Sequence, residues 1–225
     1  MGKLRAFLSY STKDRKLAGN IKQQLEYWGI DVFLAHEDIA PSRQWQDEII
    51  DNLKECQVFM PLLTKHFRKS EWTDQESGMA MAHSRVIVPL SVEMDLHGFI
   101  KRYQALKLVV RALDDSCKKI LLAMSADKRL KTSLQEAFVS SFLASKSFDE
   151  ANNKSELLES LGPYDADQLN RIFGGSVDNS QISGAFTAEK KLKELFKRNL
   201  DVARPGVKDS FQKTFGLVKS ADKGS

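Results

Sequence analysis

The stretch LRAFLS, residues 4–9, begins the pattern that decides the fold. It is short, almost wholly apolar and followed by polar residues, as expected of a β-strand that is buried on both faces. Comparable runs recur along the first half of the chain, at residues 30–34 (IDVFL), 58–63 (VFMPLL), 85–92 (RVIVPLSV) and 106–110 (LKLVV). Pro61 is unfavourable inside a central strand, so it predicts a strand end or an irregularity at that point.

Segments with helical spacing separate these runs. The first carries its apolar residues three or four positions apart, at Ala18, Ile21, Leu25 and Trp28, and Gly29 follows as a helix stop. Trp45, Ile49 and Leu53 mark a second helix, and residues 70–83 a third. Strands alternating with helices predict an α/β fold of the flavodoxin-like type, a parallel five-stranded sheet covered by helices on both faces.

The second half of the chain has a different character. Strand-like runs cease after about residue 112, and helical spacing follows at 117–124, 130–142, 155–161, 165–173 and 187–200. Residues 145–155 are polar and loop-like, while Gly174-Gly175 and Pro205-Gly206 are expected breaks. We therefore expect an α/β domain over 1–111 and an α-helical C-terminal region over 112–225, with a frayed tail in the last dozen residues.

Composition excludes several classes of protein. Hydrophobic residues make up 42% and charged residues 28% of the 225, which is typical of a globular chain. The net charge of +4 is not gathered into a basic stripe, so nucleic-acid binding is not expected. No apolar run is long enough to span a bilayer, so no membrane contact is expected. Cys56 and Cys117 lie far apart in apolar surroundings and are interpreted as reduced, partly buried thiols of a cytoplasmic protein.

Four stretches, in their order along the chain, resemble the boxes of the TIR family in its bacterial style. They are AFLSYSTKD (6–14), GIDVFLAHEDIAPSRQWQDEI (29–49), CQVFMPLLTKHFRKSEWTDQE (56–76) and RVIVPLSV (85–92). The resemblance covers about half of the chain. Two departures concern the loop after the second strand, where residues 35–38 replace the family's usual Asp and Pro41-Ser42 replaces its usual Gly. The family's loop shape is therefore not carried over to this chain.

Glu76 follows Trp72 by four residues, which places both on one face of a helix. In enzymatically active TIR domains the matching glutamate cleaves NAD at the nicotinamide–ribose bond, so the resemblance implies that Glu76 is catalytic. Loss of nicotinamide leaves an oxocarbenium-like ribosyl cation, which a nearby carboxylate stabilises. The alternative is a surface glutamate on a charged helix, beside Glu71 and Asp74.

The resemblance also suggests residues that contact the substrate. Trp72 and Phe33 offer flat aromatic faces for nicotinamide or adenine, with core packing as the alternative for Phe33. Ser9 and Tyr10 follow the first strand and would meet ribose or phosphate near a helix N-terminus, unless this turn serves only to cap the helix. Arg43 would neutralise the pyrophosphate, with a solvated surface charge as the alternative.

No metal or cofactor is expected, and NAD enters as substrate. His36 and His66 are not at a metal-ligand spacing, and no Cys joins them. The sequence has no Walker loop, no Gly-x-Gly-x-x-Gly and no Gly-x-Ser-x-Gly.

The resemblance implies an NAD nucleosidase that releases nicotinamide and either ADP-ribose or a cyclic ADP-ribose isomer, in anti-phage defence signalling. It further implies self-association through the TIR domain and a possible effector protein as partner. One alternative is a non-catalytic adaptor that acts through homotypic contacts. Another is an enzyme like the nucleoside deoxyribosyltransferases, which share the flavodoxin-like sheet and act on glycosidic bonds.

Overall fold

The computed structural model describes residues 3–34, 45–67, 71–92 and 98–217. The chain divides into two compact units, Met1–Ala137 and Phe138–Ser225. Each unit has its own core and is described by itself.

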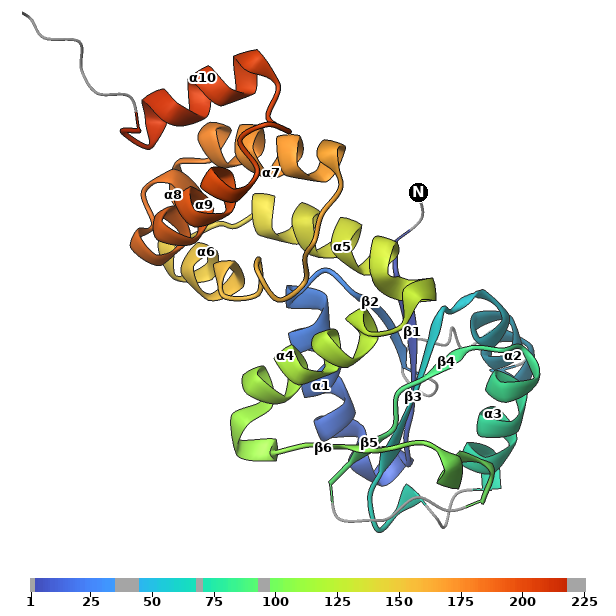
Figure 1. Ribbon diagram of the computed structural model, residues 1–225. Coiled ribbons are helices and arrows are strands. Elements are labelled where there is room, and N and C mark those ends of the chain that lie inside the picture. Colours follow the sequence, from blue (N-terminus) through green and yellow to red (C-terminus); the bar gives the residue numbers. More distant parts are fainter. Residues whose placement is uncertain (1–2, 35–44, 68–70, 93–97, 218–225) are drawn as a thin grey trace, which may run out of the picture. The chain divides into compact units, whose positions relative to one another are not determined.

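The first unit is built on a parallel sheet that lies between helices (Figure 1). Its strands, within the described residues, are β1 (Arg5–Ser9), β2 (Asp31–Leu34), β3 (Val58–Leu63), β4 (Val86–Ile87), β5 (Leu90–Ser91) and β6 (Leu106–Lys107). They follow the order β2-β1-β3-β5-β6, and β4 also pairs with β3. The predicted flavodoxin-like α/β fold is therefore confirmed.

One predicted strand, residues 85–92, is divided in two. β3 pairs with β4 through its first two residues and with β5 through its last two. Pro89 lies between β4 and β5, and its backbone faces away from β3, where its carbonyl accepts from the N–H of Leu106 at 2.8 Å. The strand end or irregularity expected at Pro61 is wrong, because Pro61 lies within β3 and pairs with Ser9 of β1.

Helices cover both faces of the sheet. Those of the first unit are α1 (Arg15–Tyr27), α2 (Trp45–Glu55), α3 (Glu71–Ala82), α4 (Leu113–Ser125) and the first part of α5 (Lys128–Leu143), with short 3-10 helices η1 (Thr12–Asp14), η3 (Gly98–Arg102) and η4 (Val110–Ala112). Figure 1 shows α1 and α4 on one side of the sheet and α2 and α3 on the other. The predicted stop of the first helix is confirmed, since Gly29 has a φ of 93° that favours glycine.

The apolar core beneath α2 and α3 explains which way β1 points its side chains. It contains Phe7, Ile49, Leu53, Cys56, Phe59, Leu63, Phe67, Ala80, Ile87 and Ile100. Alternate residues of a strand share one face, so Ser9 points to the same side as Phe7, toward α3. The end of β1 thus presents a hydroxyl group to that helix.

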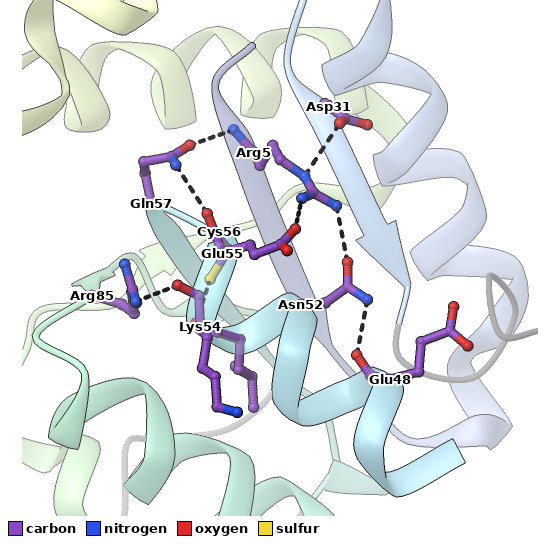
Figure 2. A network of polar contacts seen from close by, with 10 residues as sticks. Arg5, Asp31, Glu48, Asn52, Lys54, Glu55, Cys56, Gln57 and Arg85 are labelled. Atoms are coloured by element: carbon purple, nitrogen blue, oxygen red, sulfur yellow. Dashed lines mark hydrogen bonds and ion pairs between the residues drawn. The ribbon is translucent and has the colours of Figure 1, made fainter. Parts of the chain in front are cut away.

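The amino ends of the strands are tied to α2 by Arg5, which Figure 2 shows among its polar partners. Its guanidinium forms ion pairs with Asp31, at 3.5 Å, and with Glu55, and donates to Oδ1 of Asn52 at 3.0 Å. Its backbone N–H donates to Oε1 of Gln57 at 2.8 Å. Two carboxylates therefore face this one cation.

The first unit ends later than the boundary expected after residue 111. α4 contacts α1 and β6, and it buries Ile120, Leu121 and Met124. A parallel sheet needs helices on both faces, and α4 supplies part of that cover. The first unit therefore extends to Ala137.

The second unit is α-helical in its described residues, as predicted for the C-terminal region. Besides the end of α5 it has α6 (Phe148–Ser155), α7 (Ala166–Asp178), α8 (Ser180–Ser183), α9 (Phe186–Arg198) and α10 (Pro205–Thr214). The rings of Phe173, Phe196 and Phe211 lie 4.4–5.3 Å apart in its core. Within the described parts of both units, no helix is both long and apolar enough to cross a membrane.

The expectation of a loop over 145–155 is wrong, because α6 lies there. Ser147 caps this helix by accepting a hydrogen bond from the backbone N–H of Glu150 at 3.1 Å. Lys154 is buried, and its ammonium group donates to Glu150 and to the backbone carbonyl of Ser141. Polar residues here satisfy one another inside the unit, so low hydrophobicity did not indicate a loop. The helix expected near 155–161 is instead a turn that follows α6.

Two expected breaks are also wrong. α7 runs through Gly174 and Gly175, and Pro205 begins α10. Proline is favoured in the first turn of a helix, where its missing N–H has no intrahelical partner to lose. Gly175 serves packing, since a Cβ built on it would lie 2.9 Å from Cδ1 of Leu143.

Replacing each of the two glycines of α7 by alanine should change the stability of the protein in opposite directions. Gly174→Ala should raise the free energy of unfolding by up to about 1 kcal/mol through helix propensity, since the nearest atom to its Cβ is 4.0 Å away, in Val207. Gly175→Ala should be less stable than Gly174→Ala by about 1 kcal/mol or more, because Leu143 must move. Urea unfolding of the full chain measures both, and equal effects would contradict the packing role of Gly175.

Candidate functional site

The carboxyl group of Glu76 meets the end of β1. Oγ of Ser9 donates a hydrogen bond to Oε2 of Glu76, which joins two segments 67 residues apart in the sequence. Glu76 lies on α3 and is only 1% exposed, and Ser9 is fully buried. The alternative interpretation of Glu76 as a solvated surface residue is therefore wrong.

Burial changes the acidity of Glu76. Loss of solvation raises the pKa of its carboxyl group to about 7, while the hydrogen bond from Ser9 acts in the lowering direction. Its other oxygen, Oε1, is buried and has no hydrogen-bond partner among the described residues. A buried acceptor of this kind is unfavourable unless a ligand satisfies it, and perturbed carboxyl groups gather at functional sites. Glu76 is therefore the strongest candidate for chemistry in the first unit.

Hydrogen bonds anchor the helix that carries Glu76. Oγ1 of Thr73 donates to the backbone carbonyl of Phe67 at 3.1 Å, which ties the start of α3 to the segment that follows β3. Oγ of Ser77 donates to the carbonyl of Thr73 at 2.7 Å. These contacts hold the first turns of α3 in place beneath the sheet. Trp72 is in the first turn, four residues before Glu76, but its side chain lies outside the described part of the structure.

Within the described residues, the structure does not bring the other predicted substrate contacts to Glu76. Tyr10 is fully buried directly after β1, so its ring belongs to the core in this conformation. Phe33 is partly buried on β2, with its ring 5.3 Å from that of Phe7, which is the packing that its alternative interpretation expects. Arg43 lies outside the described residues. Of the predicted set, the structure brings Ser9 and Glu76 together, and the remaining roles stay predictions.

A second polar cluster lies at the same edge of the sheet, and the sequence analysis missed it. Oγ1 of Thr64 donates to Oδ2 of Asp14 at 2.5 Å, and Nδ1 of His66 lies 2.9 Å from Oδ1 of Asp14. The backbone N–H groups of His66 and Phe67 donate to Oγ1 of Thr64 at 3.2 and 3.3 Å. Asp14 follows β1 and Thr64 follows β3, so the adjacency of these strands was the signal that could have found the cluster.

The Asp14–His66 pair suits acid–base chemistry better than metal binding. An imidazole oriented through Nδ1 by a carboxylate presents Nε2 to other groups. Within the described residues, no three or more His, Cys, Asp or Glu side chains are grouped so as to hold a metal ion. Cys56 and Cys117 are buried free thiols, and burial raises their pKa to about 11 and about 12.

Comparison with known proteins identifies the class to which this fold and site belong. The model of the TIR domain family matches residues 6–121, which is more than half of the chain. The chain therefore belongs to the TIR domain family. The match extends beyond residue 111 into α4, in agreement with the extent of the first compact unit.

Among solved structures, the chain is similar to the TIR domain of the Toll-related receptor TRR-2 from Hydra magnipapillata. The two share 18% sequence identity with a TM-score of 0.47, over 54% of this chain and 98% of that chain. No curated protein matches the sequence. TIR domains generally self-associate through homotypic contacts, and the family includes both signalling modules and enzymes that cleave NAD.

The raised pKa of Glu76 predicts a pH-dependent stability. Because the folded-state pKa of about 7 exceeds the ordinary value of 4.5, the folded chain binds more protons than the unfolded chain between these values. Relative to Glu76→Gln, the wild type should therefore lose free energy of unfolding as pH rises through this range, by at most about 1.4 kcal/mol per pH unit. Urea unfolding of both proteins at a series of pH values measures the difference. A difference that does not change with pH would show that burial leaves this carboxyl group unperturbed.

Proposed function

We propose that this chain is an NAD nucleosidase that breaks the bond between nicotinamide and ribose, with Glu76 as the catalytic carboxylate. One observation carries the proposal: a buried carboxyl group with a pKa near 7, held by Ser9 through one oxygen and without a hydrogen-bond partner for the other among the described residues. It lies where β1 ends, and ligands of parallel α/β sheets bind beyond the carboxyl ends of the strands.

The positive charge that develops on the ribose during this reaction suits a nearby carboxylate. In NAD the nicotinamide ring is cationic, and it leaves as a neutral molecule that takes both electrons of the glycosidic bond. The positive charge then resides on the ribose, where an ionised carboxylate stabilises it most strongly in a low-dielectric site. Oε1 of Glu76, which has no partner in the described part of the chain, would accept a hydrogen bond from a ribose hydroxyl, while Ser9 stabilises the ionised form through Oε2. The cationic substrate would itself favour ionisation of Glu76.

The fate of the ribosyl cation defines the product. Addition of water at the ribosyl carbon, with loss of one proton, gives ADP-ribose. Attack by an atom of the adenine ring gives a cyclic ADP-ribose isomer. We propose that Trp72 and Phe33 hold the nicotinamide or adenine ring, that Tyr10 contacts the ribose, and that Arg43 pairs with the pyrophosphate.

The burial of Glu76 supports a requirement for assembly. At 1% exposure the carboxyl group is closed to a substrate, so catalysis needs a rearrangement that uncovers it. TIR domains self-associate, and we propose that contacts between TIR units drive this rearrangement. Nicotinamide release per molecule should then rise with protein concentration. In this proposal the protein acts in the cytoplasm in anti-phage signalling, and the helical C-terminal unit contacts an effector.

The same burial favours a second candidate function. A TIR domain in which the carboxyl group of Glu76 stays buried would act as an adaptor, through homotypic contacts alone. Absence of nicotinamide release at high protein concentration, together with self-association in light scattering, would support the adaptor.

Substitution of Glu76 tests the enzyme directly. With NAD and concentrated full-length protein, Glu76→Gln should lower nicotinamide release by about a hundredfold or more, because the transition-state charge loses its partner. Ser9→Ala should lower it by about tenfold, since one hydrogen bond to the carboxylate is lost. Asp74→Asn removes the charge of an exposed acid on the same helix and serves as the matched control, with unchanged release. Chromatography with mass spectrometry measures nicotinamide and the ADP-ribose products, and full activity in Glu76→Gln would refute the assignment.

The rate should also depend on pH. Because the ionised form of Glu76 stabilises the ribosyl cation, kcat/KM should rise about tenfold per pH unit below its pKa of about 7 and level off above it. Initial rates of nicotinamide release across this range measure the profile, with Asp74→Asn expected to match the wild type. A profile that falls as pH rises through 7 would require a protonated Glu76 and contradict this role.

A further inference from the structure

A pocket of about 740 Å³ opens along the outer edge of β4. Its walls come from the end of α3, β4, residues 102–106 and the corner between α4 and α5, all within the first unit. β4 pairs with Val58 and Phe59, at the start of β3, whereas Ser9 and Glu76 meet at the end of β1. Neither Ser9 nor Glu76 lines this pocket, so it is distinct from the candidate catalytic site.

The pocket exists because the sheet is incomplete at this edge. β6 begins at Leu106 and pairs with β5, so it does not extend alongside β4. The N–H group of Val86 donates to the carbonyl of Gln57, directly before β3, and that of Val88 donates to the carbonyl of Phe59 in β3. Successive residues of a parallel strand bond to opposite sides, so the N–H and C=O of Ile87 face away from β3, toward the pocket. The wall thus presents a main-chain donor and acceptor side by side.

The lining carries more positive than negative charge. Arg85, Arg102 and Arg129 are accompanied there by one acid, Asp127. Asp127 holds Arg129 through two hydrogen bonds, of 2.7 and 3.0 Å, and Arg129 also donates to the carbonyl of Ser84 at 3.1 Å. One acid therefore balances one of the three arginines.

The other two arginines have no acid as partner in the pocket lining. Arg85 donates to the carbonyl of Lys54, a contact visible in Figure 2, and its Nε is a buried donor without a hydrogen-bond partner among the described residues. Arg102 is exposed; its guanidinium lies over the ring of Tyr103, 5.1 Å from the centroid, and donates to the Tyr103 hydroxyl at 3.0 Å. Tyr103 packs its own ring against the apolar core, which fixes the position of the ring.

We propose that this pocket binds a nucleoside phosphate, with the phosphate held by Arg85 and Arg102 and the base placed against the main chain of Ile87, while Tyr103 positions the guanidinium of Arg102. The volume is in the range of pockets that enclose a small organic ligand. Apolar side chains of Met81, Val88, Leu106 and Ala123 complete the walls and favour a ligand with an aromatic ring over phosphate alone. Guanidinium groups bind phosphate oxygens through paired, charge-assisted hydrogen bonds. The site would give the TIR unit a ligand contact separate from the substrate of Glu76.

The test uses the full-length protein carrying Glu76→Gln, so that turnover at the proposed catalytic site does not contribute. Isothermal titration calorimetry with ADP should show saturable binding, and inorganic phosphate should bind at least about tenfold more weakly. Arg102→Glu should weaken ADP binding by about tenfold or more, because it reverses a charge at the phosphate. Lys101→Glu makes the same charge change on the adjacent exposed residue, which does not line the pocket, and should bind ADP as the parent does.

Hydrogen exchange separates this site from any other on the chain. ADP should slow exchange in peptides that cover residues 85–88 and 102–106, and Arg102→Glu should abolish this protection. Absence of ADP binding at millimolar concentration, equal affinity in Arg102→Glu and Lys101→Glu, or protection confined to peptides that contain Ser9 or Glu76 would each overturn the proposal. Phosphate binding as tight as that of ADP would overturn the role given to Ile87 and the apolar walls. Matching urea unfolding of the two charge variants excludes loss of fold as the cause.

Discussion

The central strands β1 and β3 of the parallel sheet are buried on both faces, and this constraint arranges the rest of the TIR unit. Phe7 of β1 and Phe59 of β3 stack beneath α2 and α3 with their centroids 5.8 Å apart. Strands of this kind have no solvated face, so polar side chains collect where the strands end. The helices must then cover both sides, which is why α4 belongs to the same compact unit as the sheet.

Polar and titratable side chains meet at the carboxyl ends of β1 and β3. Ser9 turns toward α3 because it shares a face with Phe7, and there it meets Glu76. A few residues further along the chain, Asp14 holds both Thr64 and His66. The unfavourable burial of the Glu76 carboxyl group is compensated by the surrounding core, and it leaves a group that changes its charge near neutral pH.

The arginines of the TIR unit differ in whether acidic side chains balance their charge. At the amino ends of the strands, Arg5 is matched by Asp31 and Glu55, so its charge is balanced within the protein (Figure 2). Along the open edge of β4, only Arg129 has an acid as its partner in the pocket lining. A balanced cation ties secondary-structure elements together, whereas cations without an acid partner in a pocket suit an anionic ligand.

The sequence by itself determined the alternation of strands and helices, the parallel sheet and the place of Glu76 on a helix, because apolar periodicity reports local structure directly. It failed where polar residues satisfied one another in α6, and where Gly175 served close packing inside α7. Only the tertiary structure decided that Ser9 reaches Glu76, that this carboxyl group is buried, that Asp14 meets His66, and that β6 leaves the edge of β4 open. These contacts join segments far apart in the chain, so they depend on strand order and register, which the local pattern of residues does not contain.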